Sequence, residues 1–126
     1  MTVTPHDHVE FVELPGRTSA DPLRSIAAQS SMRIARPENM ESRNAHRHPH
    51  SEEVIYVRHG AGVIYIDGVT QSIAAGDTVH IPQGAAHATI PDDGADMELI
   101  CFFPHPDLSN NIEETDIDVM KEIDDE

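Results

Sequence analysis

Short runs of β-branched and aromatic residues, separated by turn-forming residues, are the feature that most constrains the fold of this chain. The runs at 54–57, 63–66, 78–81 and 99–103 follow the two-residue alternation of a strand. Turn signals lie between them, and one is the dipeptide Asp67-Gly68, which favours a two-residue hairpin. No pattern of helical length precedes the last residues. The sequence therefore predicts an all-β fold of short antiparallel strands in a sandwich or barrel.

The 126 residues suit a single domain with flanking segments. We expect an N-terminal extension over residues 1–24, in which only 11–14 resembles a strand, here an edge strand. A β-barrel is expected over 25–106 and an acidic segment over 107–126. Residues 111–126 hold eight acidic residues and one lysine. This segment can be a solvated, disordered tail or a short C-terminal helix that docks through Ile112, Val119 and Ile123.

Charge and composition limit the partners of the protein. A formal net charge of −15 opposes binding to nucleic acid and to anionic membranes. No apolar run approaches the roughly 20 residues of a membrane span. The single cysteine, Cys101, allows no internal disulfide, and residues 1–10 lack the pattern of a secretory signal. These observations predict a cytoplasmic protein without nucleic-acid or membrane partners. An acidic surface adapted to high salt is an alternative explanation of the charge.

His46 and His48 are the first candidates for metal binding. Residues two apart on a strand point to the same side, so the two imidazoles can reach one ion. Pro49 cannot donate to a strand ladder, and the strand is expected to end there. The next strand is expected to begin near Glu53. If its inner face carries Glu53, that carboxylate lies on an apolar wall, at a cost that a metal ion removes. The neighbouring Glu52 is then expected to point away or to lie in the turn.

His87 is the third candidate histidine. It follows a predicted strand at 78–81 and the turn Pro82-Gln83-Gly84. A tight turn at this point reverses the chain, and His87 then begins the next strand. The geometry brings a third imidazole toward the first two.

Both stretches resemble the sequence motifs of the cupin family. The first motif is Gly, five residues, His-x-His, three or four residues, Glu, six residues and Gly. The second is Gly, five residues, Pro-x-Gly, two residues, His, three residues and Asn. The residues that match are His46, His48, Glu53 and Gly60 in the first motif and Gly76, Pro82, Gly84 and His87 in the second. The leading glycine is absent and Pro91 replaces the closing Asn, but neither position is a ligand.

The resemblance implies a double-stranded β-helix, the jelly-roll barrel of cupins, with one divalent metal ion per chain. The ligands at the matching positions are His46, His48, Glu53 and His87. This donor set suits Fe²⁺, Mn²⁺, Ni²⁺, Co²⁺, Cu²⁺ or Zn²⁺ and leaves an open coordination position for a small-molecule substrate. Small one-domain cupins are similar to sugar-processing isomerases, polyketide cyclases and dioxygenases. The family also leads us to expect a homodimer.

Several alternatives stay open at this point. A shifted ligand set would use His48 and His50, although Pro49 separates them. His80 and Glu52 are candidates for catalytic proton transfer, but His80 can also be a surface or core histidine. Candidates for holding a substrate carboxylate are Arg33, Arg43, Arg47, Arg58, Tyr56 and Tyr65.

The function predicted from these residues is that of a metal-dependent enzyme with isomerase, cyclase, lyase or dioxygenase chemistry. One alternative is a metal-dependent binding module without turnover. The others are a structural or metal-storage role and a cupin that binds no metal.

Overall fold

The computed structural model describes residues 1–124, which form 11 strands, two 3-10 helices and one α-helix. In chain order these are η1 (His6–His8), β1 (Val12–Leu14), β2 (Arg17–Ala20), β3 (Ser31–Pro37), β4 (Asn44–Arg47), β5 (Glu53–His59), β6 (Ala61–Ile66), β7 (Val69–Ala74), β8 (Thr78–Ile81), β9 (His87–Pro91), β10 (Glu98–Phe103), η2 (Leu108–Asn110), β11 (Glu113–Asp118) and α1 (Val119–Asp124). Among these residues, no helix is long and apolar enough to cross a membrane.

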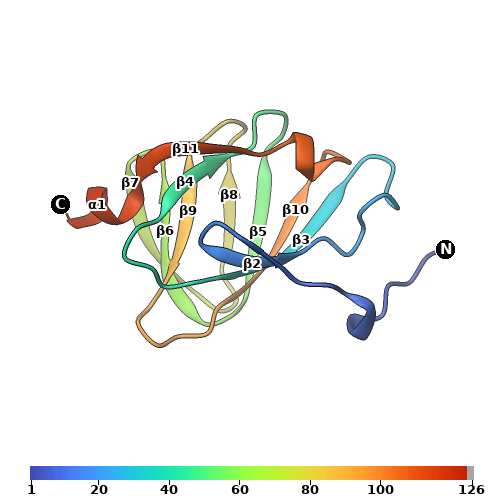
Figure 1. Cartoon of the computed structure of the whole chain (residues 1–126), viewed down its shortest axis with the longest axis horizontal. Coiled ribbons are helices and arrows are strands. Elements are labelled where there is room, and N and C mark those ends of the chain that lie inside the picture. The colour runs from blue at the N-terminus through green and yellow to red at the C-terminus, as the bar shows by residue number, and fades with distance from the viewer. Residues whose placement is uncertain (125–126) are drawn as a thin grey trace.

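Two antiparallel sheets make up the molecule (Figure 1). The strand order is β1-β2-β3-β10-β5-β8 in the six-stranded sheet and β11-β4-β9-β6-β7 in the five-stranded sheet. The expected all-β jelly-roll barrel is confirmed. The predicted hairpin is also present, since β6 and β7 pair from Ile66 opposite Val69. The two turn residues, Asp67 and Gly68, have φ of 45° and 87°, as a tight hairpin of this kind requires.

The inner faces of the two sheets enclose an apolar core. Along β5, Glu53, Ile55 and Val57 are buried and alternate with exposed residues, so the face that carries Glu53 is the inner one, the alternative on which the metal site depends. Ile55 and Val57 pack with the inward residues of β10, Leu99, Cys101 and Phe103. Cys101 is therefore a small buried residue of the core, with a free thiol.

The N-terminal segment adds two strands to the six-stranded sheet. β1 is the edge strand expected from residues 11–14. β2 was not predicted, because its sequence is polar, yet it pairs with β3 over its whole length. It places Arg17 and Ser19 on the inner face of the sheet, where both are buried. The division of the chain at residue 24 stays a prediction.

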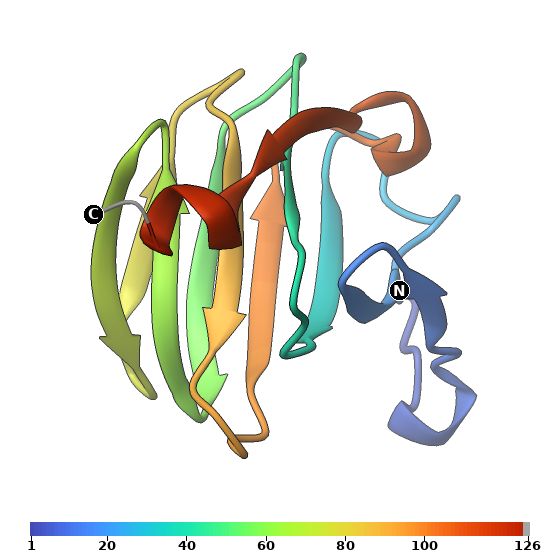
Figure 2. The same cartoon turned by 60° about the vertical axis from the view of Figure 1, so that its left-hand side comes forward.

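The C-terminal segment crosses the outer side of the five-stranded sheet (Figure 2). β11 pairs with β4, and α1 then packs over an apolar patch that includes Ala45, Ala88 and Ile90. Val119 is fully buried there, and Ile123 packs against the same patch. The interpretation as a docked short helix is confirmed for these two residues. Ile112 precedes β11 and is not part of the helix, and residues 125 and 126 lie outside the described part.

Candidate metal centre

Three histidines meet inside the barrel. His46 on β4 and His87 on β9 are directly opposite each other in the strand register, and His48 follows the end of β4 by one residue. The ring centroids are 4.4 Å apart for His46 and His87, 5.2 Å for His46 and His48, and 5.1 Å for His48 and His87. One potential ligand atom from each residue lies within 4.8 Å of the other two. These buried histidines could bind a metal ion.

Backbone carbonyls set the orientation of two of the rings. Nδ1 of His48 lies 2.7 Å from the carbonyl oxygen of Asn111, and Nδ1 of His87 lies 2.9 Å from that of Ala85. A carbonyl oxygen only accepts hydrogen bonds, so each Nδ1 must carry a proton. In a neutral imidazole, Nε2 then presents its lone pair toward the centre of the cluster. A hydrogen-bonded Nδ1 is the usual arrangement of histidines that ligate a metal through Nε2.

Glu53 brings a carboxylate to the same point. Its Oε1 lies 2.9 Å from Nε2 of His87 and 3.2 Å from Nε2 of His48, and the residue is only 4% exposed. Burial raises the pKa of Glu53, but a proton on the imidazole nitrogens of His48 and His87, or another cation in that place, lowers it by more and keeps the carboxyl ionised at neutral pH. Burial and the nearby His87 and Arg17 keep the pKa of His46 well below its ordinary value, which leaves that ring neutral.

The imidazole nitrogens and the carboxylate oxygen at this point lie close together but form no hydrogen bonds with one another. Within residues 1–124, Nε2 of His48, Nε2 of His87 and Oε1 of Glu53 have no hydrogen-bond partner of acceptable geometry despite the short distances. A negative oxygen that faces two nitrogen lone pairs needs a cation between them, either a proton on an imidazole or a metal ion. Three imidazoles and one carboxylate are a donor set that divalent transition metals bind. The residues present therefore fit a metal ion.

The cluster lines a small cavity of about 40 Å³, here called the metal cavity. One wall is apolar and includes Ile55, Leu99 and Phe103, and the Phe103 ring is 4.6 Å from the His48 ring. Three buried arginines, Arg17, Arg33 and Arg43, also line the cavity and make part of its lining positively charged. The cavity thus combines an apolar wall with a concentration of positive charge in an acidic protein.

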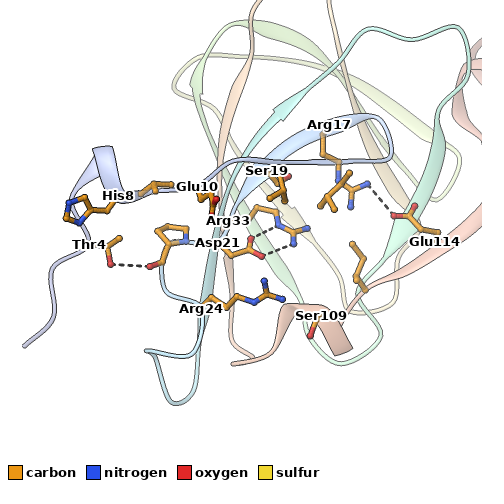
Figure 3. A pocket seen from close by; sticks show the side chains of 15 residues that line it. Thr4, His8, Glu10, Arg17, Ser19, Asp21, Arg24, Arg33, Ser109 and Glu114 are labelled. Carbon is orange, nitrogen blue, oxygen red and sulfur yellow. Dashed lines mark hydrogen bonds and ion pairs between the residues drawn. The ribbon is translucent and has the colours of Figure 1, made fainter.

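Each of the three arginines donates hydrogen bonds to oxygen atoms of the chain (Figure 3 shows Arg17 and Arg33). Arg33 donates two hydrogen bonds, of 2.9 and 3.2 Å, to the carboxylate of Asp21. Arg17 donates to Glu114 at 3.3 Å, and both Arg17 and Arg43 donate to the carbonyl oxygen of Pro15. Burial, together with the charge of Arg17, lowers the pKa of Arg43 to about 10. Burial also lowers the pKa of Arg17.

His80 and Glu52 lie outside the barrel. Nε2 of His80 is 2.7 Å from Oε1 of Glu52, and the two side chains are 58% and 52% exposed. On β8, His80 pairs with Val54 of β5. The next residue, Ile81, is buried on the inner face of the sheet, so His80 lies on the outer face, opposite to Glu53. Among the described residues that line the metal cavity, neither His80 nor Glu52 is present. Their position does not support the predicted role in proton transfer at the metal.

The other candidates divide between the cavity and the surface. His50 is not part of the histidine cluster within residues 1–124, and its ring instead stacks on His105. Arg33 and Arg43 line the metal cavity, and their role in holding a substrate carboxylate stays a prediction. Arg58 pairs with Glu98 on the surface. Tyr56 is exposed, and Tyr65 hydrogen-bonds to Glu122 of α1 on the outer side of the sheet.

Sequence reasoning missed two residues that shape the centre. Arg17 belongs to the unpredicted strand β2, and the only local signal is the preceding turn glycine, Gly16, with a φ of 74°. A Cβ at Gly16 would lie 1.8 Å from Nη1 of Arg43, so the glycine makes room for that arginine. Asn111 holds His48 through its backbone carbonyl, and no pattern in its neighbourhood indicates such a contact.

Comparison with known proteins agrees with this geometry. The sequence profile described as the cupin domain matches residues 35–103, which is more than half of the chain. The chain belongs to the cupin family. The resemblance inferred from the two motifs is thereby confirmed. No curated protein matches this cupin in a sequence comparison.

Solved structures share the fold of this cupin at low sequence identity. A Streptomyces Pac13 variant with uridine, from a protein described as a nucleoside dehydratase, has a TM-score of 0.76 and 14% identity over 97% of each chain. The polyketide cyclase RemF of Streptomyces resistomycificus has a TM-score of 0.72 and 20% identity, over 93% of this chain and 87% of its own.

A formate complex of the oxalate decarboxylase of Lactobacillus farciminis has a TM-score of 0.72 and 20% identity over 86% of this chain. The cupin spans only 34% of that longer protein. At these identities the three likenesses establish the fold alone.

Proposed function

We propose that this cupin is a metal-dependent enzyme that acts on a small organic molecule. In this proposal His46, His48, Glu53 and His87 hold one divalent ion per chain. When bound, the ion supplies a Lewis-acid or redox centre for isomerase, cyclase, lyase or dioxygenase chemistry. The small-molecule complexes of similar structures, with uridine and with formate, support a small ligand for this cavity as well.

One observation carries the proposal. Oε1 of Glu53 faces Nε2 of both His48 and His87, at 3.2 and 2.9 Å, deep inside the barrel. An ionised carboxylate that faces two lone pairs in a buried site is unfavourable without a cation. The carbonyl oxygens of Asn111 and Ala85 hold the two rings with Nε2 directed at that point. The chain itself thus maintains an arrangement that suits cation binding.

The remaining cavity residues have separate tasks in the proposed function. The apolar wall, with Leu99 and Phe103, excludes water from one side of a bound substrate. Arg17, Arg33 and Arg43 supply positive charge that binds and orients an anionic substrate. Thr89 adds a hydroxyl that can donate or accept a hydrogen bond at the cavity.

A binding module without turnover is the second candidate function, and one observation favours it. Among the described residues that line the metal cavity, Cys101 is the only acid or base besides the proposed ligands and the arginines. Burial raises the pKa of the Cys101 thiol well above its ordinary value, so it stays protonated at neutral pH. The lining therefore offers no group poised for proton transfer, and turnover would depend on the metal centre and on groups of the substrate.

The test is elemental analysis of protein purified without added metal and without a histidine tag. We expect about one equivalent of a divalent metal in the wild-type protein and little in His87→Ala. His80→Ala is the matched control, because His80 is exposed and paired with Glu52, and it should keep full metal content. A metal-free wild-type protein that cannot be reconstituted, or a His87→Ala protein with full metal content, would contradict the proposal.

The identity of the metal then selects the assay. Iron would direct the search to dioxygen uptake with catechols, thiols and diketones, and zinc, nickel or manganese to conversion of sugars and keto acids. Ligand binding without any turnover in these assays would favour the binding module.

The homodimer and the cytoplasmic location stay proposals. Exposed apolar side chains on the outer face of the six-stranded sheet, namely Val54, Tyr56 and Phe102, support self-association. Light scattering after size-exclusion chromatography measures the mass of the particle directly.

A further inference from the structure

Two polar side chains on β2 are buried with unused hydrogen-bonding atoms. Arg17 and Ser19 are two residues apart on the strand, point to its inner face, and are 4% and 1% exposed. Nη2 of Arg17 and Oγ of Ser19 have no hydrogen-bond partner among residues 1–124. Buried polar atoms are almost always satisfied in folded proteins, so two such atoms on one face indicate a site for a ligand or for ordered water.

The guanidinium of Arg17 is fixed along one edge only. Its Nη1 donates to the carbonyl oxygen of Pro15 at 2.7 Å and to Oε1 of Glu114 at 3.3 Å. These bonds hold the plane of the group and leave the N–H groups of Nη2 free. Burial makes a charged guanidinium costly, and the partly exposed Glu114 compensates only part of that cost. A second anion on the free edge would complete the compensation.

Arg17 lies between two cavities. With Arg33 it lines both the metal cavity and a larger one of about 510 Å³. The larger cavity lies between the N-terminal segment and the C-terminal segment, and Figure 3 shows Ser19, Asp21, Ser109 and Glu114 around it. Ser19 lines the larger cavity only, so a ligand in this space can reach Ser19 and Arg17, and through Arg17 it adjoins the metal cavity.

The balance of charge favours an anionic ligand. Around the metal cavity, the positive charges of Arg17, Arg33 and Arg43 face the negative charges of Glu114, Asp21 and Glu53, and Glu38 adds a further negative charge near Arg43. A divalent cation at the histidines would make the sum of these charges positive. In a protein of net charge −15, such an excess is local and directs anions to this cavity.

We propose that Arg17 and Ser19 form a subsite for the carboxylate of a small organic acid, beside the metal centre. This inference rests on the proposed function, because it names the substrate class of the same cavity. Two donors, Nη2 and Oγ, match the two oxygens of one carboxylate. A second oxygen-bearing group of the same molecule, as in a dicarboxylate or a hydroxy or oxo acid, would face the metal ligands.

The experiment measures binding by calorimetry to the chelator-treated, metal-free protein and to the Zn²⁺-loaded protein. The probes are malonate, inorganic phosphate and uridine. We expect malonate to bind the metal-free protein, phosphate to bind more weakly and uridine not to bind. Arg17→Gln should weaken malonate binding roughly 10- to 100-fold, the range for hydrogen bonds to a charged group. Arg58→Gln, a change at an exposed arginine, should leave malonate binding unchanged.

Ser19→Ala separates ligand binding from folding. Removing a buried hydroxyl that has no partner should leave the thermal stability of the free protein unchanged or raise it. The same change should weaken malonate binding roughly 5- to 10-fold. If Arg17→Gln does not fold, malonate binding to Ser19→Ala still tests the proposed subsite. A Ser19→Ala protein that binds malonate like the wild type would overturn the subsite, and tighter binding of phosphate or uridine would overturn the carboxylate assignment.

Metal content distinguishes this proposal from the proposed function. Arg17→Gln and Ser19→Ala should keep the metal content of the wild type, while His87→Ala should lose the metal and still bind malonate at the metal-free level. Malonate binding that Zn²⁺ does not strengthen would leave the anion subsite standing and count against a metal beside it. Full metal content without malonate binding would overturn the subsite and leave the metal proposal standing.

Discussion

Asn111 holds His48 in place although 63 residues separate them: Nδ1 of His48 donates a hydrogen bond of 2.7 Å to the Asn111 carbonyl oxygen. The side chain of Asn111 is itself fully engaged. Its Nδ2 donates to Oγ of Ser51 at 2.8 Å, and its Oδ1 accepts from the backbone N–H of His50 at 2.8 Å. Asn111 therefore couples the segment before β11 to the loop that follows His48, and it is a positioning residue for a proposed metal ligand.

Asn111→Ala should weaken both the fold and metal binding. It leaves the backbone N–H of His50 and the hydroxyl of Ser51 without these partners, a loss of about 2–4 kcal/mol in the free energy of unfolding. Loss of the support for His48 should lower the metal affinity about 10- to 100-fold. Urea unfolding and competition with a chromogenic chelator measure the two effects. Asn110→Ala, at an exposed neighbour, is the control, and equal metal affinity in both variants would count against the positioning role.

Glu53→Gln should stabilise the metal-free protein while it weakens metal binding. At pH 8 the substitution removes a buried charge and supplies an amide N–H that can donate to Nε2 of His87 or His48. We expect the free energy of unfolding of the metal-free protein to rise by about 1–3 kcal/mol and the metal affinity to fall at least about tenfold.

The matched control for this change is Glu52→Gln, at an exposed carboxylate, which should alter neither quantity. Denaturant unfolding after chelator treatment gives the stability. A less stable metal-free Glu53→Gln protein would mean that protons on the imidazoles already satisfy the carboxylate.

Gly16→Ala should destabilise the protein more than Gly68→Ala. Both glycines have a positive φ, 74° and 87°, which costs an alanine about 1–2 kcal/mol. A Cβ at Gly16 would also lie 1.8 Å from Nη1 of Arg43, whereas a Cβ at Gly68 meets nothing within 4 Å. We expect an additional loss of about 1–3 kcal/mol for Gly16→Ala, because the buried Arg43 must move. Equal losses in thermal or urea unfolding would show that Arg43 adapts freely.

Glu98 should make the stability dependent on acid pH. Desolvation raises the pKa of Glu98, but the hydrogen bonds from Arg58 and Arg36 lower it by more, so the net shift is downward from 4.5. A carboxyl with a lowered pKa in the folded state stabilises the protein above its unfolded-state pKa, and the contribution is lost as the pH falls through the folded-state pKa.

The measurement compares unfolding free energies of the wild type and Glu98→Gln across pH. Since both arginines are partly exposed, we expect a difference of roughly 1 kcal/mol at pH 7 that shrinks steadily below pH 4.5. The same comparison with Glu41→Gln, at an exposed residue, is the control. A difference for Glu98→Gln that is constant from neutral to strongly acid pH would contradict the role of these hydrogen bonds.

The fold and the core of the candidate site could be predicted because their signals are local in the sequence. Alternation along β5 places Glu53 and Ile55 on the same face, which the structure shows to be the inner one, and the two positive-φ residues of the hairpin are encoded by Asp67-Gly68. His46 and His48 share a side because they are two apart. The same logic did not show which face of the sheet carries His80. The four residues of β8 are compatible with His80 on either face, and only the packing of Ile81 into the core selects the outer face for His80.

The sequence by itself determined the short antiparallel strands, since strand alternation and turn chemistry act over a few residues, and the spacing of the two cupin motifs indicated which histidines and carboxylate would converge. The tertiary structure alone decided what surrounds them. Arg17 lies in a polar strand that pairs with β3 and β1, and Asn111 reaches His48 from a distant segment. Such contacts depend on how separate strands are brought together in three dimensions, and no periodicity along the chain records them.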